Sequence, residues 1–247
     1  MTDPVTISLI AATFLMAGCV KGVIGLGLPT ISLAVLTATI GLHPAMGLML
    51  APSLVTNVWQ AVVGGNGVAI IARIWPFLTM ATVGVWFGAW FLTRVEVSVL
   101  SALLGALLIA YALVGLGGAR FTVSESRERW VGPIIGAVNG VLTGMTGSFA
   151  VPGIPYLQAL GLPRDKLVQA MGMLFTASTL ALAVSLGGKQ LLSAELGLIS
   201  VAAVVSACIG MIIGRRARRK IPETVFRRTF YLALVALGGV IIYRSVI

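Results

Sequence analysis

The chain has 247 residues, of which 58% are hydrophobic and 10% are charged, and its mean hydropathy is +1.06. A soluble globular domain carries about 25% charged residues, so this composition excludes a soluble protein and predicts an all-α polytopic membrane protein. The net charge of +10 does not indicate nucleic-acid binding. The basic residues gather at the ends of apolar segments, as the positive-inside rule expects, and aromatic residues are not interleaved with them.

Eight apolar segments follow one another along the chain. Two of them, at about 5–40 and 131–161, are interrupted by polar and glycine residues. The other six are long enough to cross a bilayer once, since a span needs about 20 apolar residues. They cover about 44–63, 75–93, 97–117, 165–187, 193–213 and 226–243.

The two interruptions have similar composition. The first contains Lys21, Gly25, Gly27, Pro29 and Thr30, and the second contains Gly144, Thr146, Gly147, Ser148 and Pro152. Unwound backbone in hydrocarbon is costly unless protein or a water-filled cavity covers it. Paired breaks in corresponding positions of two halves are typical of the binding site of a transporter.

The interrupted segments are too long for one helix and short for two full crossings, so each is predicted to be two half-length helices joined at the break. Two topologies follow: eight crossings, or six crossings and two re-entrant hairpins. With the basic loop 214–228 on the cytoplasmic side, the hairpin alternative places thirteen basic residues inside and three outside. The eight-crossing alternative gives ten and six, so charge favours the hairpins.

In the hairpin alternative each half of the chain is a broken helix followed by three transmembrane helices, and the halves 1–118 and 119–247 form an inverted repeat. Two short sequences match between the halves, and we call them the Ala-Met-Gly echoes. Ala45-Met46-Gly47 begins a segment that ends at Ser53, and Ala170-Met171-Gly172 begins a segment that ends at Ser178.

All seven acidic residues fall in predicted loops or at segment ends. Proton and cation pathways usually depend on buried carboxylates, so a cation carrier is disfavoured. With one histidine and two scattered cysteines, the sequence indicates no catalytic triad, metal site or cofactor. Broken helices present backbone N–H groups that suit an anion instead.

The candidate binding residues lie at the two breaks and in the span after the first. Lys21 is either a counter-charge for the anion or a lysine that reaches an interface. Asn57, Gln60 and Asn139 either bind substrate or form hydrogen bonds between helices, and Gly144 serves either binding or tight helix packing. The full set is Lys21, Gly25, Gly27, Pro29, Thr30, Asn57, Gln60, Asn139, Gly144, Thr146, Gly147 and Ser148.

At these breaks the chain resembles the sulfite exporter TauE/SafE family of membrane permeases. The resemblance rests on Gly22-x-x-Gly25-x-Gly27-x-Pro29 and on Gly140-x-x-x-Gly144-x-x-Gly147 with the Val151-Pro152 and Pro155–Pro163 stretches that follow. Family members often have a denser glycine cluster where this chain has Ser148-Phe149-Ala150. The resemblance implies transport of small sulfur anions such as sulfite, or of organosulfonates and related carboxylates.

We therefore expect a secondary transporter, not an enzyme, in a bacterial-type inner membrane. Its expected partners are a small anionic substrate and membrane lipid, with no nucleic acid, and the sequence leaves room for a homo-oligomer. The membrane subunit of an ATP-driven transporter, an anion channel and a membrane enzyme are the alternatives. The sequence has no nucleotide-binding loop, so the first alternative requires a partner ATPase.

Overall fold

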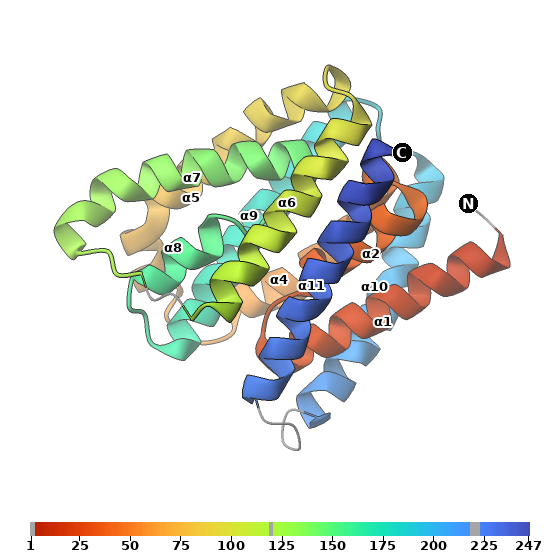
Figure 1. The fold of residues 1–247 in the computed structure, drawn as a ribbon. Coiled ribbons are helices and arrows are strands. Elements are labelled where there is room, and N and C mark those ends of the chain that lie inside the picture. The colour runs from red at the N-terminus through yellow and green to blue at the C-terminus, as the bar shows by residue number, and fades with distance from the viewer. Residues whose placement is uncertain (1–2, 119–120, 218–222) are drawn as a thin grey trace. The chain divides into compact units, whose positions relative to one another are not determined.

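The computed structural model describes residues 3–118, 121–217 and 223–247. Every regular element in these ranges is a helix (Figure 1). The elements are α1 (Pro4–Ile24), α2 (Leu28–Ile40), α3 (Leu42–Leu48), α4 (Leu50–Val62), α5 (Gly67–Ala89), the 3-10 helix η1 (Trp90–Thr93), α6 (Val97–Leu116), α7 (Glu125–Thr146), α8 (Gly153–Ala159), α9 (Arg164–Gly188), α10 (Ala194–Ala217) and α11 (Glu223–Val246). The predicted all-helical membrane protein is confirmed.

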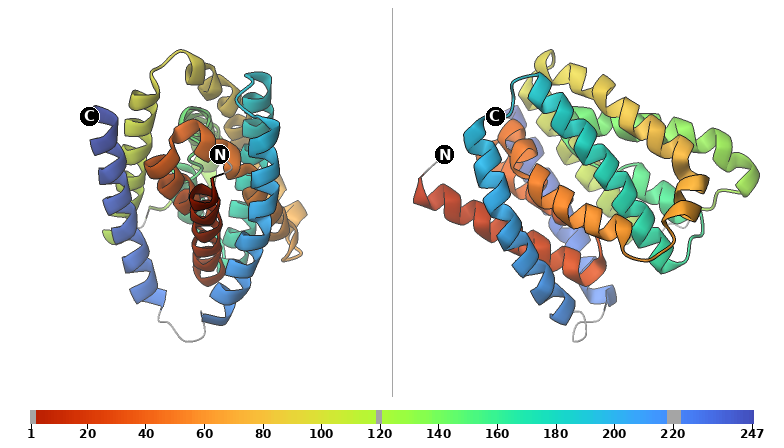
Figure 2. Two further views of the ribbon diagram at one scale, coloured as in Figure 1. Left: turned by 90° about the vertical axis from the view of Figure 1, so that its right-hand side faces the viewer. Right: turned by 180° about the vertical axis from the view of Figure 1, so that it is seen from behind.

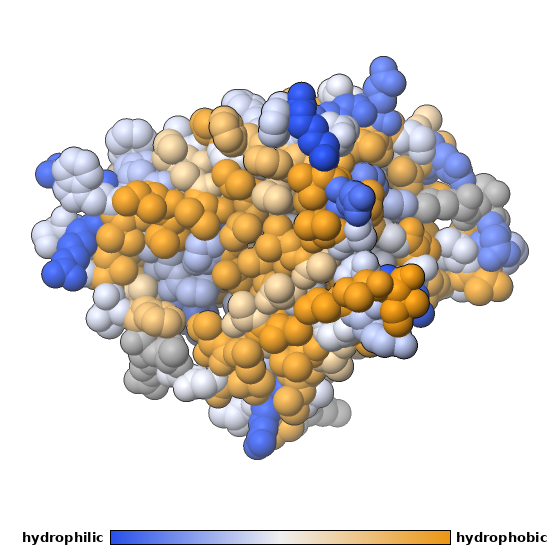
Figure 3. All heavy atoms as spheres, turned by 45° about the horizontal axis from the view of Figure 1, so that its top comes forward, coloured by the Kyte–Doolittle hydropathy of each residue, from blue (hydrophilic) through white to orange (hydrophobic). Residues whose placement is uncertain are grey.

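Six helices are long and apolar enough to cross a membrane: α1, α5 with η1, α6, α9, α10 and α11. Their outer faces carry large apolar side chains, among them Phe87 on α5 and Leu198 on α10, which are 71% and 74% exposed. Figure 3 shows apolar residues over much of the surface in one view. Such exposure suits contact with lipid, because water would make it costly.

Both predicted breaks exist, but their arms are unequal. α1 has 21 residues and α2 has 13, while α7 has 22 and α8 has 7. The prediction of two half-length helices is therefore wrong. α7 begins at Glu125, well before the apolar segment, because acidic residues in a first turn are favoured by the helix dipole and need no apolar face.

The chain turns back at each break, as the hairpin alternative expects. In Figures 1 and 2, α2 turns back from the end of α1. The N–H of Val123 donates to the carbonyl of Ala159 at 3.0 Å, which brings the end of α8 beside the residues that precede α7. The position of either hairpin in a membrane stays a prediction.

The predicted span 44–63 is not continuous: α3 and α4 meet at a bend of 44°. Pro52 explains the bend, because it has no N–H and its ring clashes with the carbonyl of Leu48 four residues earlier. Ser200 of α10 replaces the missing helix bond. Its hydroxyl donates to the Leu48 carbonyl at 2.8 Å and accepts from the Ala51 N–H at 3.1 Å.

The helices form two compact units. Unit 1 contains Met1–Pro52, Val97–Gly117 and Gln190–Ile247, and unit 2 contains Ser53–Glu96 and Gly118–Lys189. Each unit draws helices from both predicted halves, so the contact units do not coincide with the sequence division at 118. The division into repeats stays a prediction. Arg120 of the linker and Arg218, Arg219 and Lys220 of the basic loop lie outside the described residues.

Unit 1 contains a close pair, α1 against α10. A β-carbon on Gly18 would lie 2.2 Å from the Ala207 carbonyl oxygen, and one on Gly210 would lie 2.1 Å from that of Leu15. The same is true of Gly22 and Gly214 one turn further along. Only glycine permits backbones to approach this closely, as in small-residue interfaces of membrane helices.

Unit 2 contains the same arrangement, α7 against α5. A β-carbon on Gly140 would lie 2.2 Å from the Ala81 oxygen, and one on Gly88 would lie 2.0 Å from that of Val141. The spacing Gly140-x-x-x-Gly144-x-x-Gly147 repeats that of Gly18, Gly22 and Gly25. In unit 1 the first helix of the first half packs on α10, and in unit 2 the first helix of the second half packs on α5. When the bent α3–α4 pair is counted as one span, α10 and α5 are each the second span after the broken helix of their half, a pattern that an internal duplication produces.

Candidate functional site

The first break lies in unit 1 between α1 and α2. Gly25 ends α1 in the left-handed region, at φ 81°, and its N–H donates to the Lys21 carbonyl at 2.8 Å. Gly27 precedes α2 at φ 105°, a value that other residues rarely adopt. Pro29 follows in the first turn of α2, where its missing N–H costs no helix bond. These two glycines turn the chain from one helix into the next.

Lys21, Pro29 and Thr30 are all buried beside this break. Lys21 is 4% exposed and Thr30 is 6% exposed. The structure thus differs from the alternative in which Lys21 extends to a surface. The lysine lies in the last turn of α1, where a cation is stabilised by the negative end of the helix dipole.

The second break lies in unit 2 and is fastened by two threonines. The Thr143 hydroxyl donates to the Ser148 carbonyl at 2.8 Å, and the Thr146 hydroxyl accepts from the Ser148 N–H at 3.2 Å. Gly147 adopts φ 76° and donates its N–H to the Thr143 carbonyl at 2.7 Å. The Val151–Pro152 peptide bond is cis.

These bonds correct one expectation about the second break. The N–H groups of Gly147 and Ser148 are used inside the hairpin, and the Gly153 N–H donates to Asn139 Oδ1 at 2.9 Å. They are therefore not presented to a ligand. A ligand at this break would have to be bound mainly by side chains, because these three backbone N–H groups are already used.

Two other predicted residues, Gln60 and Gly144, have packing roles in unit 2, and Asn57 is buried there. The Gln60 amide donates to the Val168 carbonyl at 2.7 Å, which is the interhelical hydrogen bond named as its alternative. A β-carbon on Gly144 would lie 2.2 Å from the Val85 oxygen, so Gly144 packs against α5. Asn57 is fully buried on α4.

The structure groups the predicted site residues by unit. Unit 1 holds Lys21, Gly25, Gly27, Pro29 and Thr30, and unit 2 holds Asn57, Gln60, Asn139, Gly144, Thr146, Gly147 and Ser148. That the two breaks meet around one anion stays a prediction. Ser53 and Ser178, whose buried hydroxyls have no hydrogen-bond partner among the described residues, were not predicted. The signal was present, since each ends one of the two Ala-Met-Gly echoes.

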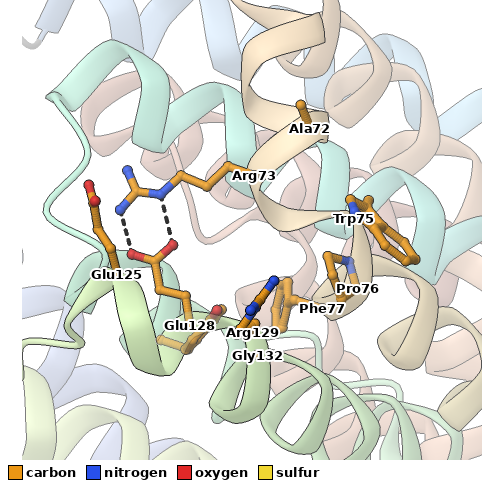
Figure 4. A pocket seen from close by; sticks show the side chains of 10 residues that line it. Ala72, Arg73, Trp75, Pro76, Phe77, Glu125, Glu128, Arg129 and Gly132 are labelled. Carbon is orange, nitrogen blue, oxygen red and sulfur yellow. Dashed lines mark hydrogen bonds and ion pairs between the residues drawn. The ribbon is translucent and has the colours of Figure 1, made fainter.

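A pocket of about 450 Å³ lies in unit 2 between α5, α7 and α8 (Figure 4). Arg73 binds Glu128 beside it through two hydrogen bonds, Nε to Oε2 at 2.9 Å and Nη2 to Oε1 at 2.5 Å. Arg73 also donates to the Leu160 carbonyl at 3.1 Å. One arginine thus fastens α5 to the start of α7 and to the end of α8. The sequence had placed Arg73 and Glu128 only as loop charges.

Removing the Arg73–Glu128 ion pair is expected to lower the stability of unit 2 slightly. A double-mutant cycle of Arg73→Ala and Glu128→Ala should give a coupling free energy of about 0.5–1 kcal/mol, since the pair is bidentate but partly exposed. The cycle is measured from thermal unfolding of the purified chain. Glu125→Ala with Arg73→Ala is the control, because Glu125 lines the same pocket one turn earlier. Equal coupling in both cycles would contradict the assignment.

Long apolar helices, lipid-compatible outer faces and polar breaks within the helices define a polytopic membrane protein. Among the residues that the structure describes, acidic, cysteine and histidine side chains form no cluster that suits a metal ion. The chain belongs to the sulfite exporter TauE/SafE family, whose model matches residues 10–241. It is thus a membrane permease of an anion-exporter family, as the resemblance implied. No curated protein and no solved structure matches it.

Proposed function

We propose that this permease is a secondary transporter that exports small sulfur-containing anions, such as sulfite or organosulfonates, across a bacterial-type inner membrane. The observation that carries the proposal is which charged side chains are buried. Within the described part of the chain, Lys21 is the one charged side chain in the buried class, and no carboxylate joins it there. A buried cation beside a helix break favours an anion and disfavours a cation.

Export of an anion needs little further coupling. An inside-negative membrane potential favours its exit by about 2.3 kcal/mol per charge per 100 mV. A buried carboxylate relay, which a proton-coupled carrier requires, is therefore not needed. In the proposed cycle the two breaks hold the anion near the midplane, and the protein exposes this site to each side in turn.

The purified chain in liposomes tests the proposal. Efflux of sulfite and of methanesulfonate is followed under an inside-negative potential, with protein-free liposomes as the reference. We expect saturable efflux that rises with the potential. Efflux equal to that of protein-free liposomes for both anions would refute the transporter, and efflux that does not saturate would indicate a channel.

A further inference from the structure

Several buried hydroxyls among the described residues are satisfied by their own helix. Thr13, Ser32, Thr146 and Thr179 donate to the carbonyl four residues earlier, at 2.6–2.8 Å. This is the usual outcome for serine and threonine within helices. Ser53 on α4 and Ser178 on α9 differ, because both are 0% exposed and neither hydroxyl has a partner in the described residues.

The two serines occupy equivalent positions in the two halves. Ser53 is the eighth residue after Ala45 in the first echo, and Ser178 is the eighth after Ala170 in the second. The buried hydroxyl of Thr37 in unit 1 also has no hydrogen-bond partner within the described ranges, but the second half has Leu157 at the corresponding distance before its Gly-Leu turn. Ser53 and Ser178 are therefore a matched pair in a way that Thr37 is not.

The packing of α4 on α9 within unit 2 relates their positions. A β-carbon on Gly172 would lie 2.6 Å from the Ala61 nitrogen. The two helices run in opposite directions at this contact (Figure 2, right). Ser53 lies eight residues before Ala61 and Ser178 six residues after Gly172, which are axial steps of about 12 Å and 9 Å in the same direction. The two serines thus lie at a similar height along the axes of α4 and α9.

Asn139 adds a third group near this level. Its Oδ1 accepts from the Gly153 N–H, while its Nδ2 has no hydrogen-bond partner among the described residues and the side chain is 0% exposed. A β-carbon on Gly153 would lie 2.9 Å from Leu174 Cδ2. Leu174 lies one helical turn before Ser178, so the free amide of Asn139 and the Ser178 hydroxyl share one region of unit 2.

We infer that Ser53, Ser178 and Asn139 bind the oxygen atoms of the transported oxyanion through neutral hydrogen-bond donors. Buried polar groups without partners are costly, and three of them in one unit indicate a ligand that completes their bonds. The Nδ2 group of Asn139 only donates, and each hydroxyl is available to donate, so the matching ligand is rich in acceptors, as sulfite and sulfonates are. This inference rests on the proposed function and assigns two serines that were not among the predicted site residues.

Calorimetric titration of the purified full chain with sodium sulfite and with sodium methanesulfonate tests the inference. We expect Ser53→Ala and Ser178→Ala each to weaken binding roughly tenfold, since each removes one hydrogen bond to a charged ligand. The ligand-free melting temperature should stay the same or rise, because each change removes an unpartnered buried hydroxyl. A merely structural serine would lower it.

Ser185→Ala is the matched control on α9, since that hydroxyl is satisfied by the Ala181 carbonyl at 2.8 Å. It should bind both anions as the unmodified chain does. If the unmodified chain binds and transports the anions and the Ser53 and Ser178 variants bind equally well, this inference alone is overturned. If the unmodified chain neither binds nor transports either anion, the proposed function fails and the inference fails with it.

Discussion

Gly210→Ala is expected to lower the free energy of unfolding by about 1–3 kcal/mol. The new β-carbon would lie 2.1 Å from the Leu15 carbonyl oxygen, which belongs to rigid helix backbone. α1 and α10 must then move apart along a contact that includes Gly18, Gly22 and Gly214. Thermal unfolding of the purified variant in detergent measures the effect.

Gly197→Ala provides the matched control, because it lies on the same helix with nothing within 4 Å of its β-carbon position. It should leave stability unchanged or raise it by up to about 1 kcal/mol, since alanine is the better helix former. Equal effects at the two positions would show that α1 and α10 are not in backbone contact. Gly88→Ala should behave as Gly210→Ala does, through the corresponding α5–α7 contact.

Lys21→Met should reduce anion efflux from liposomes at least about tenfold, which corresponds to about 1.4 kcal/mol of lost binding or barrier stabilisation. The physical reason is the low dielectric around a lysine that is 4% exposed, where a charge interacts far more strongly than in water. Methionine keeps an unbranched apolar side chain of nearly the same length and removes the ammonium group with its charge and its hydrogen-bond donors. Efflux is compared at several substrate concentrations to separate affinity from turnover.

Lys189→Met serves as the control, because Lys189 follows the end of α9 and is only partly buried. It should transport the anion normally. Full efflux in Lys21→Met, with a normal melting temperature in both variants, would mean that Lys21 has only a structural role at the end of α1. The transporter would then have to hold its anion with neutral donors alone.

The sequence by itself determined the class of protein. Its apolar segments predicted the long helices, and glycine clusters predicted a break near Gly25–Gly27 and another near Gly144–Ser148. The first lies where it was predicted, but Gly144 was wrongly placed in the second, because α7 continues through Gly144 to Thr146. The resemblance to the family is confirmed over residues 10–241. These properties depend on residues that are close together in the sequence. The length of an apolar segment determines whether a helix can span a bilayer, and a glycine can adopt the left-handed conformation that ends a helix.

Only the tertiary structure decided how polar groups are used. Gly147 and Ser148 look like open backbone in the sequence, yet Thr143 and Thr146 take up their bonds. Ser200 completes the hydrogen bonds at the Pro52 bend from a helix about 150 residues further along the chain. Ser53 and Ser178 look like ordinary helix serines in the sequence, yet the described part of the chain offers their hydroxyls no hydrogen-bond partner. Hydrogen-bond satisfaction depends on which groups meet in space, and spacing along a chain does not specify that.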